Sequence, residues 1–208
     1  MDRKINIKHR LMKSLKTYFL LSMACLLFAC ACTKEEIENL PPATQTGANT
    51  FGCLVNGKAF VSSKEPQVGR GFPAGMIYPL TLAERDSEEG LLNNIRIEGL
   101  SFGTNKTGYI YIYIYDELSV EEKSYSTDVA EGFSSFRPNY SFMSVIHSGA
   151  IYYSQENSGS ITLTRVDYEN RIYSGTFSAE LKHEDGRTIK ITEGRFDINQ
   201  NTVKTQYE

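Results

Sequence analysis

The chain has 208 residues and a formal charge of −3 at neutral pH, but its charge is distributed unevenly. The first 31 residues contain six basic residues and one acidic residue, which leaves 16 basic and 24 acidic residues for the rest of the chain. This acidic remainder disfavours nucleic acid and anionic lipid as partners, and it contains no basic stripe for phosphate. The 177 residues that follow are enough for one domain with its own hydrophobic core.

The N-terminus has the organisation of a secretory signal. Six basic residues between Arg3 and Lys16 precede an apolar run of 14 residues at 18–31. As a helix this run would extend about 21 Å, which is less than the roughly 30 Å hydrocarbon core of a bilayer. We therefore predict that residues 1–31 form a signal helix that is removed from the mature protein, with Met12 as an alternative start.

The cysteines at the end of this run predict lipidation. In a lipoprotein signal the cysteine after the cleavage site takes the lipid on its thiol and becomes the first residue. Cys32 is the preferred site, and Cys30, preceded by Leu-Phe-Ala, is the alternative. Lys34, Glu35 and Glu36 resemble the lysine-acidic-acidic sequence that follows the lipidated cysteine in surface-exported lipoproteins of Bacteroidota.

The predicted location is therefore the outer membrane, with a lipid anchor and with the domain facing the cell exterior. The periplasmic face is the alternative orientation. Two or three acyl chains, at about 0.8 kcal/mol per buried methylene, would make the attachment effectively permanent. The competing interpretation is a soluble secreted protein in which Cys30 and Cys32 are ordinary signal residues.

One cysteine remains once the signal is removed and Cys32 is acylated. This residue, Cys53, lies in an apolar segment, and we predict that it is a small buried side chain. Because it has no cysteine partner within the mature chain, the fold must be held by burial and hydrogen bonding and not by disulfides.

Residues 32–49 are predicted to be the lipidated N-terminus and a flexible linker, because they show little periodicity and contain Pro41-Pro42. The folded domain is expected to begin at residue 50 and to extend to residue 208. Its first element is a predicted hairpin, with strands at 51–55 and 58–62. Asn56-Gly57 supplies the two positive φ values of a type I′ turn.

Three blocks of the sequence resemble an uncharacterised lipoprotein family of Bacteroidota. They are the segment 46–58 (TGANTFGCLVNGK), the segment 174–177 (SGTF) and the segment 192–197 (TEGRFD). The blocks bracket nearly the whole predicted domain. The resemblance implies a β-rich lipoprotein, but the family is a domain of unknown function, so it implies no catalytic residues.

The clearest periodicity in the chain occurs at 108–116, where isoleucine and tyrosine alternate. Side chains alternate across a strand, so the isoleucines are expected to face the core. The opposite face carries the four tyrosines, which form a candidate platform for a glycan or a peptide: Tyr109, Tyr111, Tyr113 and Tyr115. The sequence favours a ladder of rings packed on neighbouring strands or half-covered by a loop over such a platform, because tyrosine is a good strand residue.

The other predicted strands are short and separated by turns. They occupy 77–83, 93–102 with a bulge at Gly99, 140–146, 150–154, 160–166, 172–182 and 188–198. In the 172–182 strand, apolar and polar side chains alternate, which indicates an antiparallel sheet with one buried face. The predicted fold is an all-β antiparallel sandwich, and a lipocalin-like closed barrel is the alternative.

No catalytic residue, metal site or cofactor is predicted. Cys53 and His147 are a weak nucleophile–base pair, and His183, Glu184 and Asp185 crowd a turn that backbone geometry explains. Asp167 and Glu169 are an unremarkable calcium candidate. Glu193 and Asp197 flank Gly194, where a turn or a bulge is expected, and Asp197 is interpreted as a structural acceptor with Arg195 as its partner.

The sequence thus favours a non-enzymatic, membrane-anchored binding or accessory module whose ligand is a glycan or a peptide. A structural or assembly partner of an envelope complex is the alternative. A hydrolase is the third interpretation, which the sequence favours least because no site for it is visible.

Overall fold

The structure is a computed structural model that describes residues 36–63, 67–68, 76–77, 80–86, 92–101, 108–133 and 139–203. The chain divides into two compact units, Met1–Glu38 and Asn39–Glu208. In the first unit only residues 36–38 are described, and they are helical. Within the described part of the chain, no helix is both long enough and apolar enough to cross a membrane.

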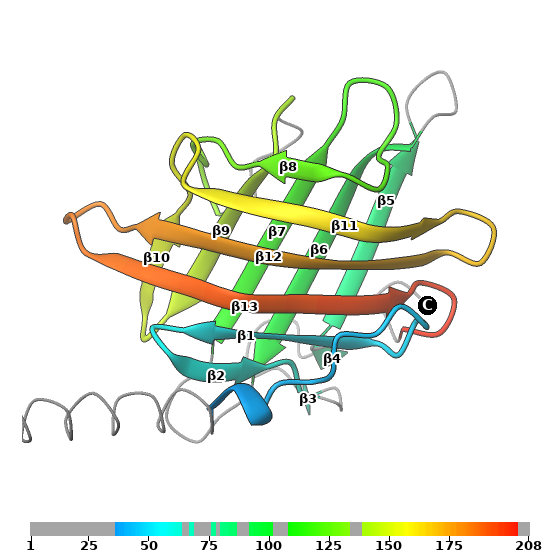
Figure 1. Ribbon diagram of the computed structural model, residues 1–208. Helices are drawn as coiled ribbons and strands as arrows, with labels where there is room; N and C mark the ends of the chain where they lie inside the picture. The colour runs from blue at the N-terminus through cyan, green and yellow to red at the C-terminus, as the bar shows by residue number, and fades with distance from the viewer. Residues whose placement is uncertain are drawn as a thin grey trace, which may run out of the picture. The chain divides into compact units, whose positions relative to one another are not determined.

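The second unit is built from one antiparallel sheet that folds into two crossing layers (Figure 1). The back layer contains β5 (Leu80–Asp86), β6 (Leu92–Ser101), β7 (Gly108–Tyr115), β9 (Phe142–His147) and β10 (Ala150–Tyr153). The front layer contains β2 (Lys58–Val61), β1 (Thr50–Val55), β13 (Thr188–Asn199), β12 (Ile172–Lys182), β11 (Gly159–Asp167) and β8 (Ser124–Ser126). A separate small sheet pairs β3 (Gln67–Val68) with β4 (Met76–Ile77).

The two layers are joined at the end of β12. Along most of its length this strand pairs with β11, but at Lys182 it pairs with Tyr153 of β10. On another edge, the backbone N–H of Ser63 donates to the carbonyl of Leu100 in β6, at 3.1 Å. The sheet is therefore strongly curled into a half-barrel, which confirms the predicted all-β antiparallel fold and combines features of the sandwich and the barrel.

The core lies between the layers, and the alternation in β7 determines one wall of it. Ile110, Ile112 and Ile114 are fully buried, as the sequence predicted. Phe51 of β1 and Phe177 of β12 belong to the same apolar cluster, with ring centroids 5.2 Å apart. Burial of apolar side chains from both layers is the main force that holds them together.

Strands β12 and β13 interlock through two glycine–phenylalanine pairs. Gly175 is the direct partner of Phe196, and Gly194 is the direct partner of Phe177. An added Cβ would lie 2.7 Å from the Phe196 ring at Gly175 and 2.5 Å from the Phe177 ring at Gly194. Each ring therefore covers the backbone of the glycine opposite, which explains the G-x-F pattern in both strands.

Strand β13 contains a bulge near Gly194, which is one of the two features, a turn or a bulge, that the sequence predicted there. At this point two residues of β13 oppose one residue of β12, and two residues of β13 oppose one residue of β1. Glu193 adopts a left-handed backbone conformation with φ 54°, and Gly194 follows it. The bulge lets β13 pair continuously with both neighbours while the sheet bends.

The hairpin between β1 and β2 is also confirmed. Asn56 and Gly57 have φ values of 50° and 76°, as a type I′ turn requires. The side chain of Asn56 accepts a hydrogen bond from the backbone N–H of Lys190 at 2.8 Å, which connects the turn to β13.

The prediction of a bulge at Gly99 is wrong. The pairing of β6 with β7 continues through Gly99 without a shift in register, and Gly99 is itself paired with Leu80 at the end of the β5 ladder. The glycine is needed for a different reason, because an added Cβ would lie 2.6 Å from the Phe51 ring of the opposite layer. Gly99 therefore marks a point where the two layers approach each other too closely for a larger side chain.

We expect Gly99→Ala to lower the free energy of unfolding by about 1–3 kcal/mol, because the new methyl group overlaps the Phe51 ring. Urea unfolding followed by circular dichroism measures the change. In the double variant with Phe51→Leu, the Gly99→Ala cost should shrink, because the smaller side chain leaves room for the methyl group. Equal costs in the two backgrounds would show that the two residues are not coupled.

Candidate functional site

The tyrosine face of β7 is largely covered. Tyr111 and Tyr113 are 3% and 5% exposed, and they form an aromatic cluster with Phe142 of β9 and with Ala130. The ring centroids of Tyr111 and Tyr113 lie 5.5 Å and 5.4 Å from that of Phe142. The row of four rings is therefore not presented to solvent as a platform, and the arrangement corresponds to the packed ladder that the sequence favours.

The two end members of the ladder differ from the middle pair. Tyr109 and Tyr115 are half-buried. The Tyr109 hydroxyl donates to the Glu98 carboxylate on β6, and burial together with this carboxylate raises the pKa of Tyr109. Tyr115 ends β7, and its backbone N–H donates to Ser141 Oγ at 2.9 Å.

Asp197 of β13 is the most densely bonded carboxylate among the described residues. It is 1% exposed and sits where β12, β13 and the segment before β1 meet. Its donors are Thr44 Oγ1 at 2.6 Å, Ser174 Oγ at 2.7 Å, and the backbone N–H groups of Gly47, Thr46 and Ala48 at 2.8, 3.0 and 3.1 Å. Burial alone would raise the pKa of Asp197, but these hydrogen bonds outweigh it and lower the pKa to about 2.

This network corrects two predictions. Asp197 is a structural acceptor, as predicted, but its partner is not Arg195, whose guanidinium lies 3.4 Å from Glu193 Oε2 and donates to the carbonyl of Pro41. The flexible linker is also shorter than predicted, because the folded unit begins at Asn39 and Leu40 is buried.

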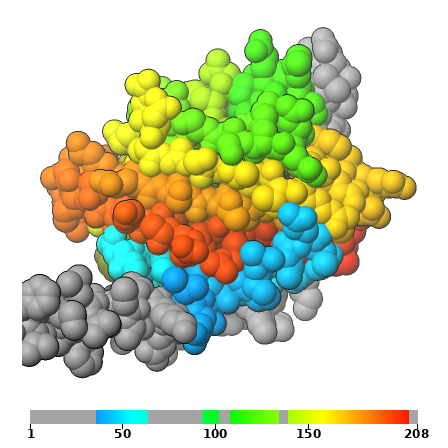
Figure 2. All heavy atoms as spheres, viewed as in Figure 1, coloured from blue at the N-terminus to red at the C-terminus, as the bar shows by residue number. Residues whose placement is uncertain are grey.

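The segment 39–49 lies along β13 (Figure 2), and contacts at both of its ends fix it. An added Cβ at Gly52 would lie 2.7 Å from Pro41 Cδ. At the other end, Asn49 Oδ1 accepts a hydrogen bond from the backbone N–H of Asn199 at 2.9 Å. Arg165 of β11 donates to the carbonyl of Gln45 in the middle.

The three blocks that resemble a lipoprotein family come together around Asp197. The first block supplies the amide groups of Thr46, Gly47 and Ala48. The second supplies Ser174, and the third supplies Asp197 itself. Their shared physical role is therefore to attach the N-terminal segment to the sheet.

The other predicted candidates occupy separate parts of the fold. Cys53 is fully buried, and burial raises the pKa of its thiol, so it is an apolar core residue as predicted. His183 Nδ1 lies 2.8 Å from the carbonyl of Ile151, and its ring packs on Tyr152. His147 lies at the end of β9, and Glu184 and Asp185 occupy the turn after β12.

Asp167 is engaged within its own turn. Its carboxylate accepts from the backbone N–H of Asn170 at 2.9 Å and pairs with Arg165 at 2.6 Å, and these hydrogen bonds lower the pKa of Asp167 to about 2. Glu169 is exposed in the same turn. Among the residues that the structure describes, no three His, Cys, Asp or Glu side chains are grouped so that they could hold a metal ion.

The predicted lipidation residues lie mostly outside the described residues. This applies to Cys30, Cys32, Lys34 and Glu35, whereas Glu36 begins the helical residues 36–38. Phe133 also packs on the tyrosine row, with its ring centroid 5.0 Å from that of Tyr109.

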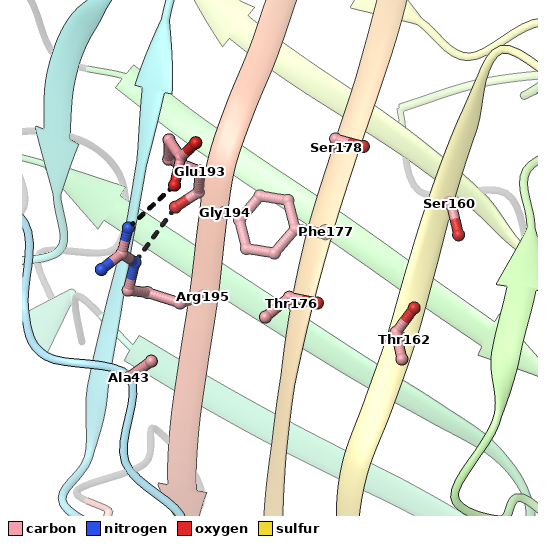
Figure 3. A pocket seen from close by; sticks show the side chains of 9 residues that line it. All are labelled: Ala43, Ser160, Thr162, Thr176, Phe177, Ser178, Glu193, Gly194 and Arg195. Atoms are coloured by element: carbon pink, nitrogen blue, oxygen red, sulfur yellow. Dashed lines mark hydrogen bonds and ion pairs between the residues drawn. The ribbon is translucent and has the colours of Figure 1, made fainter. Parts of the chain in front are cut away.

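One depression lies on the outer face of the front layer, above the β13 bulge. It has a volume of about 470 Å³ and is open to solvent. Figure 3 shows its hydroxyl groups on β11 and β12, namely Ser160, Thr162, Thr176 and Ser178, and the Glu193–Arg195 pair on β13. Because its two charged side chains neutralise each other and the Phe177 ring is buried, it offers little to bind a ligand.

A second depression, which we call the rim pocket, lies where four segments meet at the end of the tyrosine row. It has a volume of about 280 Å³. Its described lining residues come from the end of β7, from β8 and the two residues after it, from the segment before β9 and from the β10–β11 turn: Tyr115, Tyr125, Ser126, Thr127, Asp128, Asn139, Tyr140, Ser141, Glu156 and Asn157. This pocket combines aromatic rings with amides, carboxylates and hydroxyls.

Sequence reasoning missed the rim pocket except for Tyr115. Its residues are separated by up to 42 positions, and no regular spacing links them. A local signal in the sequence was Asn157 before Ser-Gly, a combination that is typical of a turn. In the structure Asn157 has a left-handed φ of 55°.

No protein-family model matches the chain, and comparisons with curated proteins and with solved structures gave no match. The resemblance to a lipoprotein family therefore stays a prediction.

We expect Tyr111→Ala to lower the free energy of unfolding by about 3 kcal/mol or more, because it removes a ring from the buried aromatic cluster. Tyr111→Phe keeps the ring and should cost about 1 kcal/mol or less. Chemical denaturation of both variants checks this. A small loss of unfolding free energy in Tyr111→Ala would instead indicate that the tyrosines form an exposed platform.

We expect Asp197→Asn to cost about 2–4 kcal/mol, because the amide nitrogen cannot accept the hydrogen bonds of the buried carboxylate. The folded pKa of about 2 lies below the ordinary value of 3.8, so this stabilisation is present above about pH 4 and lost as the pH falls toward 2. Unfolding measured between pH 5 and pH 2 should therefore show a steeper loss for the wild-type chain than for the variant.

The matched control is Glu193→Gln, which changes the same charge four residues away at an exposed position. It should cost no more than about 1 kcal/mol, as exposed ion pairs do. If Asp197→Asn were equally mild, the carboxylate would not be the attachment point of residues 44–48.

Proposed function

We propose that the protein is a non-enzymatic lipoprotein of the outer membrane that works as a surface-exposed binding or accessory module. The observation that carries this proposal is the position of Cys32 at the end of the predicted signal, eight residues before Leu40, the first buried residue of the folded unit. The anchor and the domain are thus separated by a short stretch of chain.

The length of this stretch limits how far the domain can lie from the membrane. Eight fully extended residues span at most about 26–29 Å. The linker expected from the sequence, which ended at residue 49, would have spanned about twice that distance. A lipidated Cys32 would therefore hold the domain close to the bilayer surface, and its net negative charge would help to keep it from lying on anionic lipid.

Binding is a better proposal than catalysis for the residues at hand. A nucleophilic cysteine must be able to form a thiolate, and the buried Cys53, with its raised pKa, is unsuited to that role. His183 uses one ring nitrogen on the Ile151 carbonyl, and the other lies 3.7 Å from Asp185. The rim pocket, by contrast, offers mixed polar and aromatic groups in a concave site, as ligand-binding sites do.

Metabolic labelling with an alkyne analogue of palmitate, in a bacterial host that processes lipoproteins, tests the anchor. We expect the wild-type chain and Cys30→Ala to carry the label and to remain with the outer membrane. Cys32→Ala should lose the label and become soluble. Protease treatment of intact cells should digest the domain if it faces the exterior.

Two outcomes would contradict this proposal. The first is a wild-type chain that carries no label. The second is a Cys30→Ala, Cys32→Ala double variant that stays bound to membranes as firmly as the wild type.

A further inference from the structure

We propose that the rim pocket binds a neutral carbohydrate, with one sugar ring seated in the pocket and the rest of the saccharide leaving through its open side. This inference rests on the proposed role as a binding module and names the ligand of that module.

The aromatic part of the pocket suits the apolar face of a sugar. Tyr115, Tyr125 and Tyr140 line it from three different segments. Tyr140 is half-buried, and its ring lies 6.4 Å from that of Phe142, at the edge of the covered aromatic cluster. Tyrosine offers a large rigid ring with a polar tip, so it can stack on C–H groups and still hydrogen-bond to a hydroxyl.

The polar part of the pocket retains unused hydrogen-bonding capacity. Asp128 accepts the backbone N–H of Val129 with Oδ1 at 2.7 Å, and Oδ2 has no partner among the described residues. Asn157 accepts from Ser126 Oγ at 2.9 Å, which leaves its amide N–H groups without a partner in the described part of the chain. Glu156 and Asn139 are exposed at the rim.

The mixture of donors and acceptors distinguishes a sugar from a simple ion. A cation is bound by acceptors alone, whereas the side-chain amides of Asn139 and Asn157 carry N–H donors as well as acceptor oxygens. An anion would meet the carboxylates of Asp128 and Glu156, and none of the described lining residues is basic. The neighbouring hydroxyl groups of a sugar can each donate and accept, so they match both the amide donors and the carboxylate acceptors of the pocket.

The walls of the pocket are held in place before any ligand arrives. The backbone N–H of Asn157 donates to the Thr127 carbonyl, and that of Asp128 donates to the Ser141 carbonyl, both at 2.8 Å. The Tyr125 hydroxyl donates to Asp116 at 3.2 Å, which fixes the orientation of its ring. A prearranged site loses less conformational entropy on binding, so weak individual contacts can add up to a measurable affinity.

The size of the pocket agrees with a single ring. Its volume of about 280 Å³ lies just below the roughly 300–1,000 Å³ typical of sites for drug-sized molecules. An open site of this size suits the end or a branch of a glycan more than the middle of an extended chain.

The experiment uses the full chain, purified from membranes in detergent, on an array of neutral, sialylated and sulfated oligosaccharides. We expect binding to neutral saccharides, and titration calorimetry with the best of them gives the Kd. Tyr140→Ala should weaken binding about tenfold by removing the stacking ring. Glu156→Ala, at an exposed position, should weaken it by a similar factor without changing the unfolding midpoint.

Two controls match these variants. Tyr140→Phe keeps the ring and should retain affinity within about threefold, which separates stacking from the hydroxyl. Glu169→Ala removes an exposed carboxylate from the β11–β12 turn and should leave the Kd unchanged. The same four variants are also titrated with a neutral peptide and a lysine-rich peptide.

The proposal is overturned if no neutral saccharide binds, if sialylated or sulfated glycans are preferred, or if the lysine-rich peptide is the ligand lost in the rim-pocket variants. It is also overturned if Tyr140→Ala and Glu169→Ala behave alike. Palmitate labelling of the same preparation separates the two proposals, because a labelled chain that binds no sugar would leave the anchor standing and remove only the carbohydrate site.

Discussion

A single buried carboxylate fixes where this domain begins. A charged group excluded from water is costly unless its oxygens are hydrogen-bonded, and Asp197 satisfies its oxygens with donors from two separate parts of the chain. Ser174 comes from the neighbouring strand, and the backbone amides come from residues 46–48. The N-terminal segment is therefore held in the fold by its hydrogen bonds to the Asp197 carboxylate. The carboxylate can in turn stay buried because the segment supplies those donors.

The same constraint connects the front layer to the proposed anchor. Once residues 44–48 are bound to β13, the free chain before the domain is short, and the domain cannot move far from an acylated Cys32. The tyrosine face of β7 also has more than one role. Its middle is used for packing, and its Tyr115 end contributes to the rim pocket, so one alternating strand serves the core, the outer aromatic cluster and the candidate binding site.

Sequence reasoning succeeded where structure is local. The alternation in β7 predicts which isoleucines are buried, and Asn56-Gly57 predicts its turn, because both depend on residues within a few positions of one another. The polar alternation in β12 fails only at Ser174, which is fully buried because it donates to Asp197. That exception depends on a partner in the next strand, and alternation within β12 alone does not reveal it.

The errors concern contacts between distant parts of the chain. Gly99 suggests a bulge when β6 is considered alone, but its role is set by the Phe51 ring in the other layer. Residues 39–49 have the composition of a linker, and their attachment depends on an acidic residue about 150 positions later. The rim pocket is assembled from four segments, so only the fold brings its tyrosines, amides and carboxylates together.

The attachment of the N-terminal segment to Asp197 is the central claim of this account, and amide hydrogen exchange tests it most directly. The backbone N–H groups of Thr46, Gly47 and Ala48 should exchange as slowly as those of β13, because they are hydrogen-bonded to a buried carboxylate. Exchange at the rate of an unstructured peptide would contradict the account and would return residues 39–49 to the role of a flexible linker.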